Sequence, residues 1–141
     1  MSIKNFEEIV ENFEFLDDWE DRYRYVIELG KDMASLDSSL KVSATKVDGC
    51  ASQVWIVPHV KGTGKDAIFS FQGDSDAMIV RGLIAILSAL YNNLTIEKIL
   101  TLKVYEELEK LGLNDHLSSQ RSNGLTAMIK RIDDIANKAK T

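Results

Sequence analysis

Apolar side chains recur at helical spacing through the first third of the chain. Those of residues 6–13 stand three or four positions apart, as on one face of a helix. A second apolar face runs through residues 19–33 (WEDRYRYVIELGKDM), where Asp17 or Asp18 can cap the amino end. Residues 34–49 have no such stripe and are rich in Ser and Asp, so two helices followed by a loop are predicted.

Two runs in the middle of the chain have the pattern of strands. Residues 52–60 (SQVWIVPHV) are rich in β-branched and aromatic side chains, and residues 67–73 (AIFSFQG) alternate between apolar and polar. The glycine-containing segment 61–66 between them predicts a hairpin loop. Pro58 has no N–H for a ladder, which predicts an outward-facing edge position or a bulge. A third short strand is expected near residues 44–48.

The second half of the chain is predicted to be helical. Residues 76–91 are apolar almost all round, which is typical of a helix in the middle of a domain, and Ser75 can cap it. Thr95 can cap a further short helix, and residues 104–112 end at a glycine stop.

The order of these elements predicts the fold class. A long apolar stripe predicts a last helix from Ser118 or Ser119 to about Lys140. Strands in one block with helices before and after them indicate an α+β fold rather than βαβ winding. We expect a small antiparallel sheet of about three strands, packed against several helices in one compact domain over residues 1–141.

Composition places the chain among globular proteins and argues against two classes of partner. Hydrophobic residues make up 45% and charged residues 28%, and the formal net charge of −5 argues against nucleic acid. The longest apolar streak, residues 82–91, is too short to span a membrane. Acids interrupt the apolar positions of the amino terminus, which is therefore unlike a signal or transit peptide, and we expect a cytoplasmic protein.

The charge is distributed unevenly. Residues 1–36 hold ten acids and four bases, whereas residues 121–141 hold five bases and two acids. Two faces of opposite sign would steer a protein partner, and ordinary solvated helix surfaces would have the same pattern.

Several polar motifs have structural explanations. The loop KGTGKD at 61–66 lacks the strand–loop–helix order of a phosphate-binding loop. Asp74 and Asp76 flank a predicted helix start, where carboxylates interact favourably with the helix dipole. His59 and His116 lie far apart and no Cys/His cluster has zinc spacing, so we expect no metal site.

Cys50 is the only cysteine of the chain, which excludes an internal disulfide. Free cysteines are usually buried and inert, but this one follows Gly49 at the mouth of a strand, in a position suited to close approach by another molecule. No local signature of a cysteine hydrolase surrounds it, and the nearby Asp48 disfavours a thiolate. These features suit a presented thiol that accepts or passes on a group while a partner does the harder chemistry.

Four segments resemble the SufE family of sulfur-acceptor proteins, which includes the CsdE branch. The cysteine segment VDGCASQVWIV matches the family's GC-x-S-Q-VW pattern without a gap. The other blocks are WEDRYRYVIELGKDM, QGDSDAMIVRGLIAIL and HLSSQRSNGLTAMIKRI, and all four stand in the family's order across nearly the whole chain.

The resemblance implies a function. SufE-family proteins work beside a PLP-dependent cysteine desulfurase of the SufS or CsdA type, which leaves a persulfide on its own cysteine. The implied acceptor here is Cys50, which would pass the sulfur toward an Fe–S scaffold or another downstream acceptor. The chain itself would need no cofactor and would not be an enzyme in its own right.

Other residues carry over as support for the cysteine. Gly49, Ser52 and Gln53 would shape or fix its loop, and Asp74 and Asp76 would hold the helix start near it. Arg121 would either attract the thiolate or persulfide or pair with a carboxylate. The chain departs from the family pattern at Thr45, Pro58 and Ser119, which bears on loop geometry and strand length.

Two other function classes remain open at this level. A non-catalytic domain could bind and regulate a desulfurase while Cys50 stays inert. A free-standing cysteine hydrolase or transferase would turn over substrate without any partner.

Overall fold

The amino-terminal part of the chain is a helical hairpin. The computed structural model describes residues 5–113 and 116–140. Helix α1 (Phe6–Phe15) is capped by Asn5, whose side chain accepts from the Glu8 N–H, and helix α2 (Trp19–Asp32) is capped by Asp18, whose side chain accepts from the Asp21 N–H. Both helices predicted from apolar spacing are confirmed.

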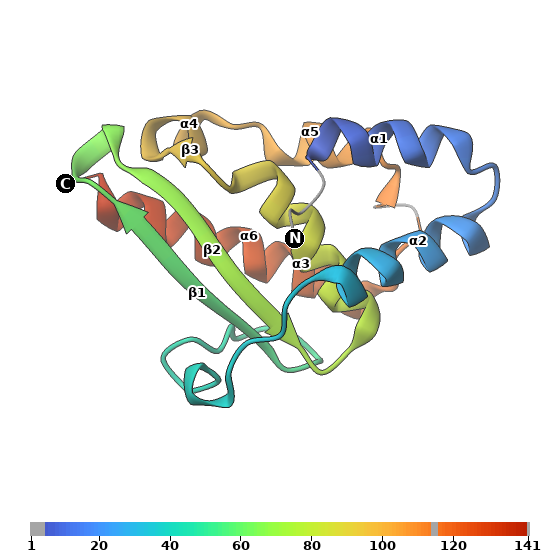
Figure 1. Ribbon diagram of the computed structural model, residues 1–141, viewed down its shortest axis with the longest axis horizontal. Coiled ribbons are helices and arrows are strands. Elements are labelled where there is room, and N and C mark those ends of the chain that lie inside the picture. Colours follow the sequence, from blue (N-terminus) through green and yellow to red (C-terminus); the bar gives the residue numbers. More distant parts are fainter. Residues whose placement is uncertain (1–4, 114–115, 141) are drawn as a thin grey trace.

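A three-stranded antiparallel sheet follows (Figure 1). Strand β1 (Val54–Lys61) pairs along its full length with β2 (Ile68–Ser75), and β2 pairs with the two-residue strand β3 (Leu94–Thr95) in the order β1-β2-β3. Pro58 therefore lies on an edge strand, as predicted, and its side chain is exposed. The hairpin loop contains a short 3₁₀ turn, Gly64–Asp66.

The third strand lies elsewhere than the sequence predicts. The segment near residues 44–48 makes only an isolated bridge, Lys46 with Trp55, closed by bonds from Val47 N–H to Val54 and from Ile56 N–H to Thr45. The next donor along this edge would be Pro58, which has no N–H, so the ladder stops there. The place beside β2 is taken by β3.

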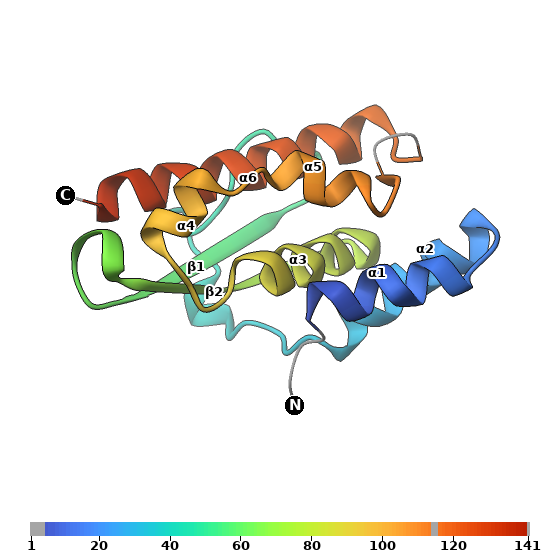
Figure 2. The same ribbon diagram turned by 90° about the horizontal axis from the view of Figure 1, so that it is seen from above.

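Helix α3 (Met78–Tyr91) forms the centre of the molecule, between the sheet and the α1–α2 hairpin (Figure 2). Eleven of its fourteen residues are buried, which confirms the prediction of a central helix. Its backbone packs directly on α2: a Cβ atom on Gly82 would lie 2.1 Å from the Val26 carbonyl oxygen, and one on Gly30 would lie 2.7 Å from the Gly82 nitrogen. Glycine at both positions permits this close crossing.

The predicted cap of α3 was wrong. Ser75 is the last residue of β2, and the helix begins at Met78 with Ala77 as its N-cap residue. The Ser75 hydroxyl instead accepts from the Ala77 N–H in the turn between strand and helix. Ser75 pairs with Val54 at the end of the ladder, and this pairing keeps the chain extended two residues longer than the helical pattern indicates.

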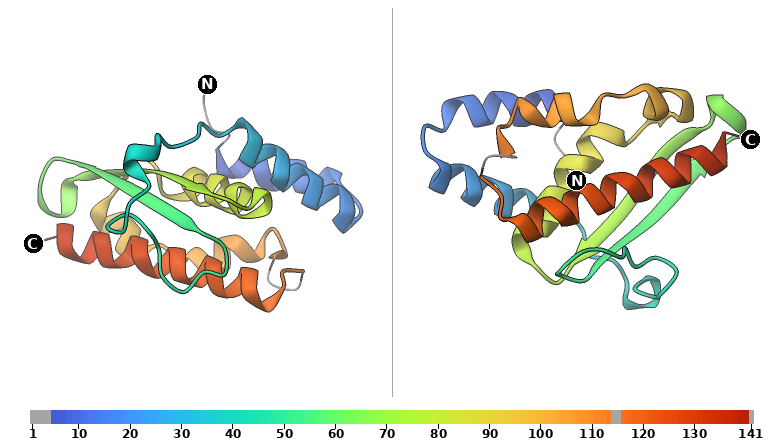
Figure 3. Two further views of the ribbon diagram at one scale, coloured as in Figure 1. Left: turned by 90° about the horizontal axis from the view of Figure 1, so that it is seen from below. Right: turned by 180° about the vertical axis from the view of Figure 1, so that it is seen from behind.

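The remaining described helices follow β3 along the chain. Helix α4 (Ile96–Thr101) is capped by Thr95 as predicted, and α5 (Val104–Glu109) is followed by Gly112 in a left-handed conformation. Helix α6 (Ser119–Ala139) is capped by Ser118, runs along the β1–β2 hairpin and ends near the hairpin loop (Figure 3). Within the described ranges, no helix combines the length and apolarity that crossing a bilayer requires.

Candidate functional site

Cys50 lies at the tip of a short loop that crosses α6. We call residues 48–53 the cysteine loop. Its base is closed by the hydrogen bond between Val47 and Val54, with an N···O distance of 2.8 Å. Gly49 precedes the cysteine with a φ of +90°, in the region that disfavours side chains, and so turns the chain at the tip.

The thiol of Cys50 rests against the backbone of α6. Its Sγ donates to the Gly124 carbonyl at 3.7 Å, a weak bond between residues 74 positions apart, and the side chain is half-buried. A Cβ atom on Gly124 would lie 3.7 Å from Sγ, an ordinary van der Waals contact, so the sulfur lies close to the backbone of α6 at this residue.

The surroundings of Cys50 favour the neutral thiol. Burial raises its pKa, and the negative charge of Asp48 raises it further. A thiolate is the nucleophile in sulfur exchange, so the thiol in this position is at rest rather than activated.

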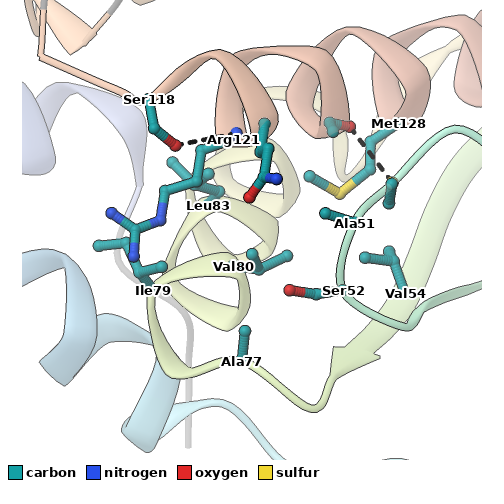
Figure 4. Close-up of a pocket in the computed structure, with 13 residues that line it drawn as sticks. Ala51, Ser52, Val54, Ala77, Ile79, Val80, Leu83, Ser118, Arg121 and Met128 are labelled. Carbon is teal, nitrogen blue, oxygen red and sulfur yellow. Dashed lines mark hydrogen bonds between the residues drawn. The ribbon is translucent and has the colours of Figure 1, made fainter.

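A cavity of about 280 Å³ opens beside the thiol, between the cysteine loop, α3 and α6. Figure 4 shows Ala51 and Ser52 facing Val80 of α3, with Met128 of α6 above them. The floor is mostly apolar, and Ser118 and Arg121 bring polar groups to one end. This space is large enough for a small group carried on the cysteine.

The far limb of the cysteine loop is fastened by Asp76. The Asp76 carboxylate accepts from the Gln53 N–H at 3.0 Å, and the backbone N–H of Asp76 donates to the Gln53 carbonyl at 3.3 Å. The turn between β2 and α3 therefore holds the point where the loop becomes β1.

Comparison with known proteins identifies the family. The SufE family, described as an Fe–S metabolism associated domain, matches residues 7–136. An uncharacterized SufE-like protein of Rhizobium etli is 52% identical over 132 residues, which are 94% of this chain and 89% of the relative. A second, from Rhizobium meliloti, is 48% identical over 128 residues, or 91% of each chain. This chain belongs to the SufE family.

A solved structure carries the same fold. The solution structure of a hypothetical protein from Thermus thermophilus superimposes with a TM-score of 0.71, covering 99% of this chain and 98% of the other. Sequence identity is 18%, so this likeness concerns the fold alone. The α+β class and the small antiparallel sheet predicted for a SufE-family protein are confirmed.

The two aspartates of the SufE-like block QGDSDA have different places. Asp76 binds the cysteine loop, whereas Asp74 does not line the cavity, belongs to a buried cluster and is only 1% exposed. Its carboxylate accepts from the N–H groups of Leu36 and Ser75 and forms ion pairs with Lys41 and Arg81. Burial alone would raise the pKa of Asp74, but these donors and charges outweigh it and hold that pKa below its usual value.

Arg81, one of the two charged partners of Asp74, connects three segments of the SufE fold. The Arg81 guanidinium, besides pairing with Asp74, donates to the carbonyls of Gly30 and Met33 at the end of α2. Arg81 thereby joins the end of β2, the start of α3 and the end of α2. Asp74 belongs to the framework beneath the site and does not line the cavity.

Arg121 shares the cavity with Cys50 but lies at its other end. Its N–H is capped by the Ser118 hydroxyl, and its guanidinium lies beside Ile79, across the cavity from Ser52 (Figure 4). Within residues 5–113 and 116–140, no carboxylate lies within ion-pair distance of it. Of the other sequence-predicted residues, Ser52 lines the cavity, and Gln53 acts through its backbone.

Neither histidine lies where it would serve the thiol. His116 stacks on Trp19 with ring centroids 3.8 Å apart, and His59 is exposed on β1. In the part of the chain that the structure describes, no group of His, Cys, Asp and Glu side chains is arranged to hold a metal. The sequence did not predict that residues of α3, or Gly124 and Met128 of α6, line the cavity. In the sequence they are only positions on the face of a helix.

Proposed function

We propose that this SufE-family chain is a sulfur carrier. In this proposal Cys50 accepts sulfane sulfur from the persulfide of a PLP-dependent cysteine desulfurase of the SufS or CsdA type, stimulates that enzyme, and passes the sulfur toward Fe–S cluster assembly. The observation that carries the proposal is the sole cysteine at the tip of a short loop, held by one weak bond beside a cavity.

The transfer is a thiol exchange. The Cys50 thiolate attacks the terminal sulfur of the donor persulfide, a new S–S bond forms on Cys50, and the donor's own S–S bond breaks. The electron pair of the broken bond leaves with the donor cysteine as a thiolate, and the proton lost by Cys50 is taken up by solvent or by that leaving thiolate. No net oxidation occurs, so the step needs no further reactant.

The resting state of the thiol supports dependence on a partner. Burial and Asp48 raise the pKa of Cys50, and the free chain therefore holds little thiolate at neutral pH. Docking that lifts the cysteine loop away from α6 would remove the burial, and with it the larger cause of the raised pKa. Activation is in this way tied to the presence of the donor.

The cavity supports the carrier role. A persulfide is readily oxidised and readily lost to other thiols. The space between the loop, α3 and α6 would shelter the terminal sulfur, and the guanidinium of Arg121 at its far end would attract a persulfide anion that extends toward it. We place this chemistry in the cytoplasm, where a free thiol persists.

Intact mass spectrometry tests the proposal. The chain is incubated with a SufS-type desulfurase and L-cysteine, and we expect its mass to rise by one sulfur atom, a gain that dithiothreitol reverses. Cys50→Ser should show no gain and should no longer stimulate the desulfurase. Full stimulation by Cys50→Ser would instead support a purely regulatory domain, and an unchanged wild-type mass while the desulfurase turns over would refute sulfur acceptance.

A further inference from the structure

Arg131 of α6 holds the segment that leads into the cysteine loop. Its guanidinium donates to the Lys46 carbonyl at 3.0 Å and to the Ala44 carbonyl at 2.6 Å, across 85 and 87 residues of sequence. Both acceptors are backbone groups, so the contact fixes the path of the chain rather than a particular side chain. The same helix provides Gly124, on which the thiol rests.

The incoming limb of the loop is therefore fastened at its base in three ways. The Lys46–Trp55 bridge joins it to β1, Arg131 joins it to α6, and the side chain of Val47 is buried in the core. The outgoing limb is held at Gln53 by Asp76. Between these fastenings only residues 48–52 remain, and their one hydrogen bond among the described residues is that of the thiol to Gly124.

The fastenings determine how far the cysteine can travel. Cys50 is three residues from Val47 and three from Gln53, so the extended chain lets it reach at most about 11 Å from either anchor. If the incoming limb were released, the next side-chain anchor would be Lys41, which pairs with Asp74 and lies over the Trp55 ring. The arm from that anchor to the cysteine is nine residues, which could reach at most about 30 Å if its own turn at residues 42–46 also opened.

The geometry points to Arg131 as a positioning residue for Cys50: it confines the moving part of the loop to residues 48–52 and so presents the sulfur at one place on the surface. This inference rests on the proposed sulfur transfer, because a short arm is an advantage when a docked donor must meet the thiol. The donor persulfide must then approach the cleft between α3 and α6, since the loop does not extend far to meet it.

The chain offers a matched set of variants. Arg131→Ala removes both hydrogen bonds, Arg131→Lys keeps the charge but loses the two-pronged geometry, and Lys130→Ala removes an equal charge from the neighbouring exposed position. In the free protein we measure hydrogen exchange at the Val47 and Ile56 amides, which close the loop base, and alkylation of Cys50 by iodoacetamide.

Loss of the guanidinium should loosen the loop base alone. We expect exchange at these two amides and alkylation of Cys50 to be about tenfold faster in Arg131→Ala, intermediate in Arg131→Lys and unchanged in Lys130→Ala. Exchange at core amides such as that of Leu83 should stay as in the wild type. Equal acceleration of the core amides, or no difference between Arg131→Ala and Lys130→Ala, would overturn the inference.

A kinetic experiment separates positioning from general stability. With a SufS-type desulfurase and L-cysteine, we expect Arg131→Ala to raise the apparent KM for the carrier several-fold with kcat nearly unchanged, and Arg131→Lys to recover part of the loss. A fall in kcat at unchanged KM would count against a positioning role. A wild-type chain that takes up no sulfur refutes the proposed function alone, and exchange and alkylation then decide whether Arg131 fastens the loop.

Discussion

Gly124 is the point at which α6 meets the thiol, and a single methyl group there tests the described geometry. In Gly124→Ala the new Cβ would lie 3.7 Å from Cys50 Sγ and 3.9 Å from Cys50 Cβ, which are ordinary van der Waals contacts. Glycine inside a helix is less favourable than alanine by about 1 kcal/mol. Since nothing has to move, we expect the free energy of unfolding to rise by about that amount, or Tm by about 4 °C.

The same substitution elsewhere should have the opposite sign. Gly82→Ala also lies inside a helix, but its Cβ would meet the Val26 carbonyl oxygen at 2.1 Å and Val26 Cγ1 at 2.5 Å. Helices α2 and α3 would have to separate, so we expect a loss of about 2 kcal/mol or more. Comparing Gly124→Ala with Gly82→Ala shows whether the contacts of the new Cβ atom or helix propensity determines the change in the free energy of unfolding.

Urea unfolding and thiol alkylation measure the two consequences. Gly124→Ala should raise the urea midpoint of unfolding. It should leave the alkylation rate of Cys50 within about twofold of the wild type, because the cysteine loop stays in place against α6. Gly124→Leu, whose longer side chain would compete with the thiol for the space beside α6, should displace the loop and raise the alkylation rate several-fold. A destabilised Gly124→Ala, or a thiol freely exposed in it, would refute the contact between Cys50 and α6.

Three further predictions concern two carboxylates at the cysteine loop and one in the framework beneath it. Asp76→Ala removes the acceptor of the Gln53 N–H but keeps the backbone bond from the residue 76 N–H to the Gln53 carbonyl, so it should loosen the outgoing limb at a cost of about 1 kcal/mol, seen as faster alkylation of Cys50. Asp76→Asn keeps an oxygen acceptor and should change less. Asp48→Asn removes one cause of the raised pKa of Cys50, so the pH–rate profile of alkylation should move to lower pH; an unmoved profile would leave burial as the sole cause. Asp74, whose folded-state pKa is lowered, should contribute stability above its unfolded pKa that is lost as pH falls through the folded value, and Asp74→Asn should flatten urea stability across that acidic range.

The parts of the fold that the sequence predicts are those in which one face of an element is buried repeatedly. Helices α1 and α2 and the hairpin were found because their apolar positions recur with the period of the element, and α3 because it is apolar almost all round. Strand β3 was missed because two residues are too few to show alternation. It forms where Asn93, with φ at +69°, turns the chain so that its N–H meets the Phe69 carbonyl at 2.8 Å.

In the candidate site too, some residues could be predicted from the sequence and others could not. Cys50 and its loop could be located because the sole cysteine, the adjacent glycine and the flanking strand are neighbours in sequence. The roles of Asp74 and Asp76 could not be separated, since two carboxylates at a helix start look alike until the fold turns one toward Arg81 and the other toward Gln53. Which face of α6 meets the loop depends on packing across more than seventy residues.

That distance along the chain has a consequence for biosynthesis. Cys50 is made 74 residues before Gly124, the residue against which its sulfur is sheltered. At about 5–20 residues per second, the ribosome needs roughly 4 to 15 s to synthesise the intervening chain. Until α6 has been made and has docked, the thiol lacks its contact with Gly124, so the nascent chain passes through an interval in which its one cysteine is more open to oxidation and to other thiols.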